Sequence, residues 1–424
     1  MSEAVADAAI DLLIAHSGGA PRLNVSFYGG EPFLEPALLD RILDRARISA
    51  KPGQRIRCLT PTNGTRLDDA ALRLCRKQGI DLAISIDGVA GAVQRPYTDG
   101  QDSTPDLISR LPALLASGSC GGGLARMTVT PTNVGVLSTN VRALARLGFS
   151  KIVFQPAWEL AWTEVAIRAW GRELERIATW ASGARAAGLP VPALPALQAV
   201  EDRLLRGKRP RGCGAGARFC AVTTDGELFP CFRFMFESGV EECRLGDVRR
   251  GFTEPATRAE FSALSPDEQC PEVGSCASCP ARDGCVHYCP ALGFLMLRDL
   301  RAVPAVACEM MRAQVEAVRR GLGASTRPAG RVATAGWAAA IVAAGSALGL
   351  AACGGDTDSD QTRTAVDAST TFDASGTDAG ADAFVGGVCA EPVDASMDSA
   401  GGICPEIILD DADVPPPDIC SGIC

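Results

Sequence analysis

Histidine is nearly absent from this chain of 424 residues, which contains only two, His16 and His287. Neither is paired with a candidate catalytic nucleophile, so a histidine-based hydrolase is not supported. No run of basic residues is long enough to indicate nucleic acid as a main partner. The chain also begins without a secretory signal, which argues against an exported protein stabilised by disulfides.

Charge is unevenly distributed along the chain. The net charge is −9, yet residues 354–424 carry fifteen Asp and Glu and one Arg, a net of −14. Residues 1–353 therefore form a mildly basic body of net +5, followed by a strongly acidic tail. The apolar fraction of 47% is ordinary for a globular protein, and the length allows two or three domains.

Cysteine, in contrast, is abundant. Fourteen of the eighteen cysteines lie in residues 1–353. Four of them, within residues 276–289, have the spacing C-x2-C-x5-C-x3-C, and Cys308 follows. A second set precedes this run and consists of Cys213, Cys220 and Cys231. Because soft thiolates select zinc, copper(I) or iron–sulfur clusters, we expect bound metal in residues 213–308.

Strand and helix patterns alternate over the first 190 residues. The predicted helices are 3–14, 36–49, 68–78, 105–116, 141–147 and 162–187, and the predicted strands are 23–28, 55–60, 82–86, 126–130 and 152–155. This alternation indicates an α/β fold with a parallel sheet or barrel. Prolines 190, 192 and 195 mark a linker.

Several short motifs then support a family resemblance. Tyr28-Gly29-Gly30-Glu31-Pro32, Thr62-Asn63-Gly64-Thr65 and Ser85-Ile86-Asp87-Gly88 each follow a predicted strand, and Gly226-x4-Cys231 precedes the cysteine run. In this order, residues 1–323 resemble a radical S-adenosylmethionine enzyme with a C-terminal SPASM domain. The nearest subfamily is that of the anaerobic sulfatase-maturing enzymes. The resemblance implies a partial (β/α) barrel over 1–190, lacking its first strand and cluster loop, and a cysteine-rich SPASM domain over 191–323.

The resemblance also implies a cofactor site. Ligands of parallel α/β barrels bind where the strands end, which is where all three loops lie. The implied S-adenosylmethionine-binding residues are Gly29, Gly30, Glu31, Pro32, Asn63, Ser85, Asp87 and Arg95. Glu31 can accept hydrogen bonds from an ammonium group. The alternative is that these glycines, Asn63 and Asp87 serve ordinary turns.

The cysteines are assigned by the same resemblance to two auxiliary [4Fe–4S] clusters. The first would be held by Cys213, Cys220, Cys231 and Cys289, and the second by Cys276, Cys279, Cys285 and Cys308. Four thiolates are the usual ligands of one cluster. A pair of structural zinc sites is the alternative. The remaining body cysteines are predicted to be buried small hydrophobes; they are Cys58, Cys75, Cys120, Cys243 and Cys270.

Two departures from the family pattern affect the expected function. The CxxxCxxC motif that binds the catalytic cluster is missing, and only 28 residues, none a cysteine, precede Gly29. We expect a truncated gene model with Met1 an internal methionine, or else a true loss that leaves an inactive scaffold. At Phe232, sulfatase maturases have an aspartate that acts as a base. Because phenylalanine cannot accept a proton, a related peptide modification is favoured over sulfatase maturation.

Three function classes follow. The favoured one is a radical enzyme that cleaves S-adenosylmethionine with one electron and abstracts hydrogen from a peptide or protein side chain. Its electron donor would be a flavodoxin or ferredoxin. The second class is a non-catalytic iron–sulfur or peptide-binding scaffold that has lost the catalytic cluster. The third is a zinc-stabilised α/β protein without a redox role.

The chain changes character after residue 326. Basic residues precede 332–352, a run of twenty-one residues without charge that ends before Cys353. Residues 327–353 resemble a bacterial lipoprotein signal and are long enough to span a bilayer. We expect a cytoplasmic enzyme body, anchored to the inner membrane, with the tail exported. Residues 354–424 are rich in Asp, Ala, Gly, Ser and Thr and are predicted to be disordered.

The tail contains a short cysteine repeat. Its members are 387–389, 402–404, 418–420 and 422–424, each a small or acidic residue, a β-branched residue and cysteine. One hypothesis is that residues 389–424 descend from, or act as, a peptide substrate fused to its modifying enzyme. The alternative, which we favour at this point, is an exported tail whose cysteines form disulfides.

Overall fold

The structure is a computed structural model of the whole chain. It describes residues 1–91, 94–116, 123–207, 213–235, 237–264, 270–271, 276–286, 289–325 and 404–409. The predicted apolar segment 332–352 and the tail cysteines 389, 420 and 424 lie outside these residues. No helix in the described ranges is long and apolar enough to cross a membrane.

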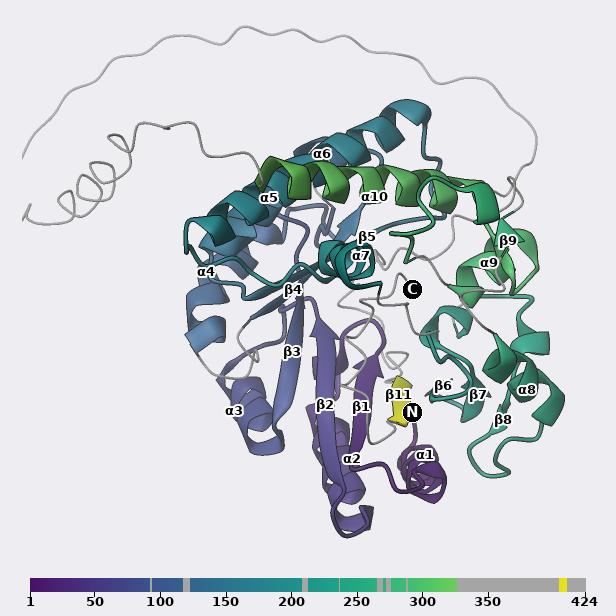
Figure 1. Cartoon of the computed structure of the whole chain (residues 1–424). Helices are drawn as coiled ribbons and strands as arrows, with labels where there is room; N and C mark the ends of the chain where they lie inside the picture. The colour runs from purple at the N-terminus through teal and green to yellow at the C-terminus, as the bar shows by residue number, and fades with distance from the viewer. Residues whose placement is uncertain are drawn as a thin grey trace, which may run out of the picture. The chain divides into compact units, whose positions relative to one another are not determined.

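Five parallel strands form the first half of the main sheet (Figure 1). They are β1 (Arg22–Tyr28), β2 (Arg55–Thr62), β3 (Ile80–Ser85), β4 (Leu124–Val129) and β5 (Lys151–Pro156). The strands lie side by side in chain order, so right-handed crossovers place the connecting helices on one face. This is the parallel α/β half-barrel that the sequence predicted.

The helices of this half match the predicted ranges closely. They are α1 (Glu3–His16), α2 (Pro36–Ser49), α3 (Asp69–Gln78), α4 (Thr104–Ala116), α5 (Leu137–Arg146) and α6 (Glu164–Ala186). Asp68 is the N-cap of α3, as expected, and its carboxylate accepts a hydrogen bond from the Ala71 N–H (2.8 Å). The amphipathic pattern determined these helices because one face of each is buried against the sheet.

The second half of the chain builds a smaller, more irregular region. Its helices are α7 (Pro195–Arg206), α8 (Pro255–Ala263), α9 (Pro290–Leu297) and α10 (Ala305–Ser325). Its strands are β6 (Phe219–Val222), β7 (Glu227–Phe229), β8 (Gly246–Asp247), β9 (Cys270–Pro271) and β10 (Ala302–Val303). Strands β6, β7 and β8 are antiparallel and extend the main sheet, whereas β9 and β10 pair with each other.

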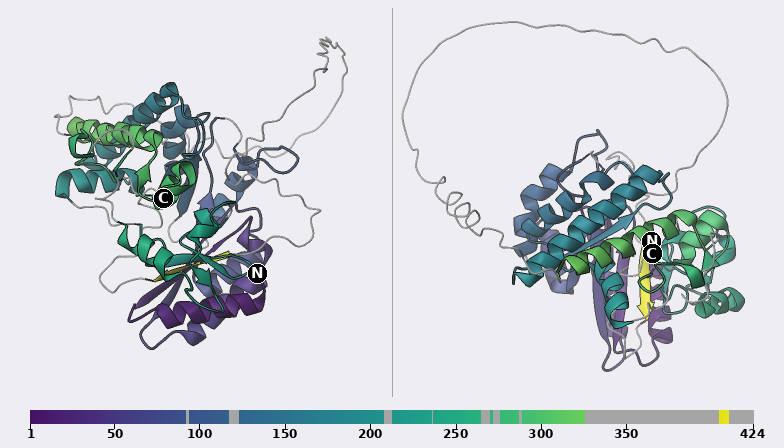
Figure 2. Two further views of the ribbon diagram at one scale, coloured as in Figure 1. Left: turned by 90° about the vertical axis from the view of Figure 1, so that its right-hand side faces the viewer. Right: turned by 45° about the horizontal axis from the view of Figure 1, so that its top comes forward.

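Helix α10 returns to the first half and lies along α6 (Figure 2). The Trp170 indole N–H donates to the Met310 carbonyl (3.3 Å). Two glycines allow the close approach: Gly171 faces Ala313, and Gly321 faces Ala178. The predicted segments 1–190 and 191–323 therefore share a helix–helix contact.

Residues 404–409 are an exception to the predicted disorder of the tail. They form strand β11 (Cys404–Leu409), which pairs antiparallel with β1 on one side and with β6 on the other. β1 and β6 offer these residues backbone hydrogen-bonding partners that the composition of the tail does not reveal.

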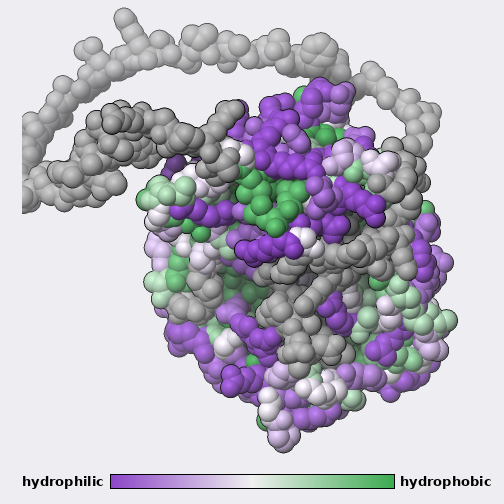
Figure 3. All heavy atoms as spheres, in the orientation of Figure 1, coloured by the Kyte–Doolittle hydropathy of each residue, from purple (hydrophilic) through white to green (hydrophobic). Residues whose placement is uncertain are grey.

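The surface drawn in Figure 3 is mostly hydrophilic where residues are placed. A group of hydrophobic residues lies near its upper centre. The large exposed hydrophobic side chains are spread over the chain and include Ile48, Val165, Leu189 and Leu205. Such scattered exposure is normal for a globular protein.

Candidate functional site

The loop after β1 is organised around the buried carboxylate of Glu31. Its Oε1 accepts hydrogen bonds from the Phe33 N–H (3.2 Å) and the Thr62 hydroxyl (2.8 Å), and its Oε2 accepts from the Asn63 N–H (2.8 Å). Gly29 has a φ of +152°, which a residue with a Cβ seldom adopts. Glu31 therefore ties the end of β1 to the end of β2.

Burial raises the pKa of Glu31 above its ordinary value, and the hydrogen bonds from Asn63, Thr62 and Phe33 partly oppose this shift. A buried carboxylate has lost its hydration, and a hydrogen bond from a positively charged partner stabilises its charged form strongly. Each carboxylate oxygen has about two acceptor positions, so one on Oε2 can still receive an ammonium N–H. Pro32 begins the short 3-10 helix Pro32–Leu34, for which Glu31 is the N-cap.

Asn63 is partly engaged in its own loop. Its Oδ1 accepts hydrogen bonds from the Thr65 N–H (2.8 Å) and the Thr65 hydroxyl (2.7 Å). This is the turn geometry that the sequence left open as an alternative. The backbone of Asn63 nevertheless contacts Glu31, so the first two predicted loops meet.

The third loop contains an ion pair. Arg95 Nε lies 2.8 Å from Asp87 Oδ2, and Asp87 Oδ1 accepts from Arg95 Nη2 (3.1 Å) and from the Thr128 N–H (2.7 Å). Asp87 thereby connects the ends of β3 and β4. Ser85 is the last residue of β3 and is half-buried. Because Asp87 pairs with Arg95, these two predicted residues do come together.

Two residues that the sequence analysis missed, Thr128 and Asn140, shape these loops together with Thr62, which the sequence analysis quoted only as part of a motif. The Asn140 Oδ1 accepts from the N–H groups of Val89 and Ala90 (both 2.9 Å). Thr62 and Thr128 belong to strands β2 and β4, near the strand ends where a ligand site was expected. Their positions in the sequence could therefore have identified them. Asn140 lies on α5, and nothing local in the sequence connects it to residue 89.

The loops lie at the carboxyl ends of adjacent parallel strands, and residues from the second half cover this edge. The Phe232 ring stacks on Tyr28, with centroids 4.7 Å apart and planes 9° apart. Arg233 Nη1 donates to Glu159, which follows β5 (2.6 Å). Phe232 and Arg233 are consecutive in the chain, and they thus contact the end of β1 and the segment after β5.

The thiols proposed for the second cluster are near neighbours. The pKa of Cys308 is raised to about 11, by burial first and then by the charges of Cys285 and Cys276, with a smaller effect from Cys279. Charges act strongly only over short separations. Four thiolates are the usual donors of one iron–sulfur cluster, so the donor type of these side chains suits such a cluster.

The segments that carry the proposed first set are connected by backbone pairing and by a contact between two aromatic rings. The Gly216 N–H donates to the Pro230 carbonyl (3.1 Å), which places the loop after Cys213 beside Cys231. Cys220 lies in β6, whose partner β7 leads to Cys231. Cys289 caps α9, whose Phe294 ring lies 5.9 Å from that of Phe234.

Within the described ranges, no three His, Cys, Asp or Glu side chains are arranged as a metal-binding group. The fit to iron–sulfur clusters therefore rests on the donor chemistry of the thiols. Cys58, Cys75 and Cys243 are buried, which confirms their predicted role as small hydrophobes. Burial raises the pKa of Cys58 and of Cys243 to about 12. Residue 120 and the side chain of Cys270 are outside the description, as is His287.

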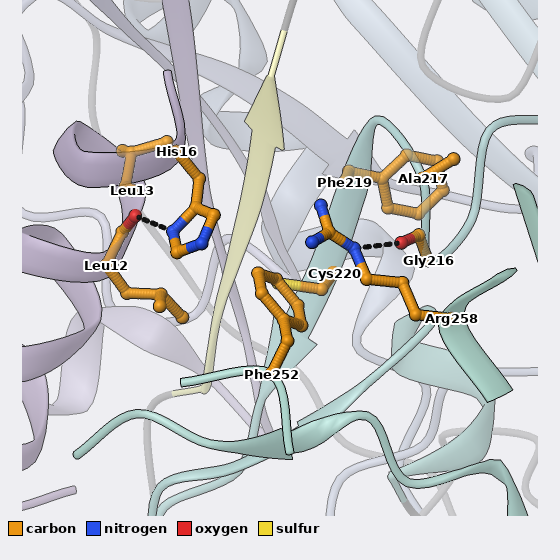
Figure 4. Close-up of a pocket in the computed structure, with 9 residues that line it drawn as sticks. All are labelled: Leu12, Leu13, His16, Gly216, Ala217, Phe219, Cys220, Phe252 and Arg258. Atoms are coloured by element: carbon orange, nitrogen blue, oxygen red, sulfur yellow. Dashed lines mark hydrogen bonds between the residues drawn. The ribbon is translucent and has the colours of Figure 1, made fainter. Parts of the chain in front are cut away.

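A pocket beside Cys220 was not predicted (Figure 4). His16 lies exposed on α1, as predicted, and meets the Phe252 ring edge-on at 5.0 Å. The Arg258 guanidinium lies 3.9 Å from the centroid of the same ring. The enclosed volume is about 10 Å³, room for about one water, so this pocket is not a cofactor site.

The parallel half-barrel with polar loops at its carboxyl edge is a fold that this chain shares with solved structures. The chain is similar to solved structures of anSMEcpe, an anaerobic sulfatase-maturating enzyme with a SPASM domain. It matches anSMEcpe with bound AdoMet at a TM-score of 0.62 and 17% identity, over 77% of this chain and 90% of that one.

Two further structures are complexes of anSMEcpe with AdoMet and a peptide. The complex with the Cp18Cys peptide matches at a TM-score of 0.62 and that with the Kp18Cys peptide at 0.61, each at 16% identity over 77% of this chain and 91% of that one. At this identity the likeness establishes the fold. No family model and no curated protein matches the sequence.

Proposed function

We propose that this chain binds S-adenosylmethionine at the carboxyl edge of β1–β3 and acts in the modification of a peptide side chain. The observation that supports this most directly is the buried Glu31 carboxylate, which joins two strand ends and retains acceptor capacity. When bound and reduced by one electron, S-adenosylmethionine would supply hydrogen-abstracting chemistry, and the cluster that delivers this electron would be held by the CxxxCxxC motif that the given sequence lacks. A flavodoxin or ferredoxin is the proposed electron donor.

The residues of this chain have separate roles in the proposal. Glu31 receives the ammonium group of the cofactor, and Gly29 and Gly30 allow its close approach. Asp87 orients Arg95 through their ion pair, so that the guanidinium can face the cofactor carboxylate. The two cysteine sets hold auxiliary clusters at the side of the barrel.

A peptide substrate is supported by the fold and by the two similar complexes, which contain peptides. The residue after Cys231 argues against sulfatase maturation. Phe232 stacks on Tyr28 and has no group that accepts a proton. The proposed reaction is therefore a peptide modification that does not use a carboxylate base at this position. Membrane anchoring through 332–352 stays a prediction.

The test is S-adenosylmethionine binding to the full chain and to Glu31→Ala, measured by isothermal calorimetry under anaerobic conditions. Loss of a hydrogen bond to a charged group is worth about 1.5–3 kcal/mol, so binding should weaken by roughly 10- to 150-fold. Glu35→Ala is the matched control, because Glu35 is exposed four residues further on. Equal affinity of the parent and Glu31→Ala would contradict the proposed site.

A further inference from the structure

Strands β2 to β5 carry an apolar face and a polar face (Figure 1). On the first face, the described apolar core takes in side chains of every one of these strands, among them Cys58, Ile80, Ala125 and Ile152. The apolar residues at the alternating positions are not part of that described core; they are Leu59, Ala83, Leu124 and Val153. Parallel sheets are usually apolar on both faces. The second face is therefore built for something other than core packing.

This second face, which we call the polar face, follows from the alternation of side chains along each strand. It consists of positions 55, 57, 59 and 61 of β2, 81, 83 and 85 of β3, 124, 126 and 128 of β4, and 151, 153 and 155 of β5. One contact shows where it leads. Arg95 Nη2 donates to the Thr128 hydroxyl oxygen (3.4 Å). The polar face thus ends at the edge where the proposed function places the cofactor.

The charged side chains of the polar face are mostly cations. The cations are Arg55, Arg57, Arg126 and Lys151, and the one carboxylate at these strand positions is Asp81. Arg57 Nη2 lies 3.5 Å from Asp81 Oδ2, so that carboxylate already has a cation beside it. Charges of one sign on a protein surface raise the local concentration of ligands of the opposite sign. The polar face therefore favours an anionic ligand.

Arg126 lies beside the proposed cofactor residues. Its Cα is directly opposite that of Ser85, and it is two residues, or about 6.6 Å, before Thr128 on the same strand. S-adenosylmethionine has a single carboxylate, which the proposed function assigns to Arg95. Binding of the cofactor thus accounts for Arg95 and does not account for Arg126. The planar guanidinium of an arginine binds a carboxylate with two parallel hydrogen bonds.

We propose that the polar face receives an acidic peptide, and that Arg126 and Lys151 determine this specificity by binding its Asp or Glu side chains. The inference rests on the proposed function and names the class of its substrate. A separate peptide is the occupant, because two of the similar solved structures have a peptide bound. Hydrogen bonds between charged groups are about twice as strong as neutral ones, so the two cations distinguish a carboxylate from an amide.

Selection of displayed random nonapeptides on the immobilised full chain tests this specificity without the cofactor. Sequencing of the bound peptides should show Asp and Glu enriched at least about threefold over the starting library, the size of effect expected for half-exposed ion pairs. In Arg126→Gln/Lys151→Gln the enrichment should disappear. A parent without enrichment, or a variant with the same enrichment as the parent, would overturn the proposal.

The matched control is Arg76→Gln/Arg146→Gln. It removes the same number of positive charges from exposed positions on α3 and α5, outside the polar face. The control should select acidic peptides as the parent does. If it lost the enrichment to the same extent, the preference would come from the net charge of the protein, and the assignment to the polar face would be wrong.

Two further measurements separate specificity from folding and from cofactor binding. Arg126→Lys keeps the charge and should keep the enrichment, whereas its loss in this variant would assign the effect to packing and refute the proposal. Arg126→Gln/Lys151→Gln should bind S-adenosylmethionine as tightly as the parent, and affinity about tenfold weaker would make these cations part of the cofactor site instead. Because the selection uses no cofactor, it can succeed or fail independently of the Glu31→Ala test.

Discussion

Glu31 illustrates how one side chain can hold a loop and prepare a binding site. Three donors converge on its carboxylate from the backbone of Phe33, the backbone of Asn63 and the hydroxyl of Thr62. These bonds fix the orientation of the carboxylate, while burial makes its charge costly. A cationic ligand would relieve that cost, which is the physical reason to place an ammonium group here.

The raised pKa of Glu31 predicts a pH-dependent stability term. The folded state binds the proton more tightly than the unfolded state, where the pKa is near 4.5. This contribution is therefore greatest below pH 4.5 and is lost as pH rises through the folded pKa. Chemical denaturation of the parent and Glu31→Gln should show a stability difference that shifts toward the variant as pH rises above 4.5. A difference independent of pH would contradict the shift.

At the scale of elements, the metal-ligand candidates of the second set lie on short irregular segments and at the start of a helix. Cys276 lies in the 3-10 helix Cys276–Ser278, Cys279 follows directly, and Cys308 is in the first turns of α10. Burial, and then the charges of the other thiols, raise the pKa of Cys308. Thiolates are soft donors that suit iron–sulfur or zinc centres, which is the basis of the proposed cluster.

Replacing Cys279 with alanine should therefore remove one cluster. Iron and sulfide of anaerobically purified protein should both fall by the content of one [4Fe–4S] unit. Cys75→Ala is the control, because Cys75 lies on the buried face of α3 and is not a candidate ligand. Iron and sulfide equal to the parent would exclude Cys279 as a ligand, and zinc in place of iron would support the structural-zinc alternative.

At the scale of the whole molecule, α6 of the half-barrel and α10 of the cysteine-rich region are held together by close packing. A Cβ on Gly321 of α10 would lie 2.6 Å from the Ala178 Cβ of α6. The half-barrel and the cysteine-rich region consequently depend on one another for burial. Such an interface tolerates little added volume, because protein interiors are densely packed.

Gly321→Val should accordingly destabilise the protein by roughly 1–3 kcal/mol, the usual cost of overpacking. Gly323→Val is a close control, because a Cβ at Gly323 meets nothing within 4 Å. Thermal unfolding of the two variants measures the difference. If both midpoints fell equally, the loss would reflect helix propensity and not the α6–α10 contact.

The sequence by itself determined the half-barrel, because its helices and strands follow from local hydrophobic periodicity and from caps such as Asp68. The order of the loop motifs also located Glu31, Asn63 and Asp87 at strand ends. Only the tertiary structure decided what depends on distant partners: Asn140 capping the loop at Val89, Phe232 stacking on Tyr28, and β11 pairing with β1. These contacts join residues about 50 to 380 positions apart, over which local propensity carries no information.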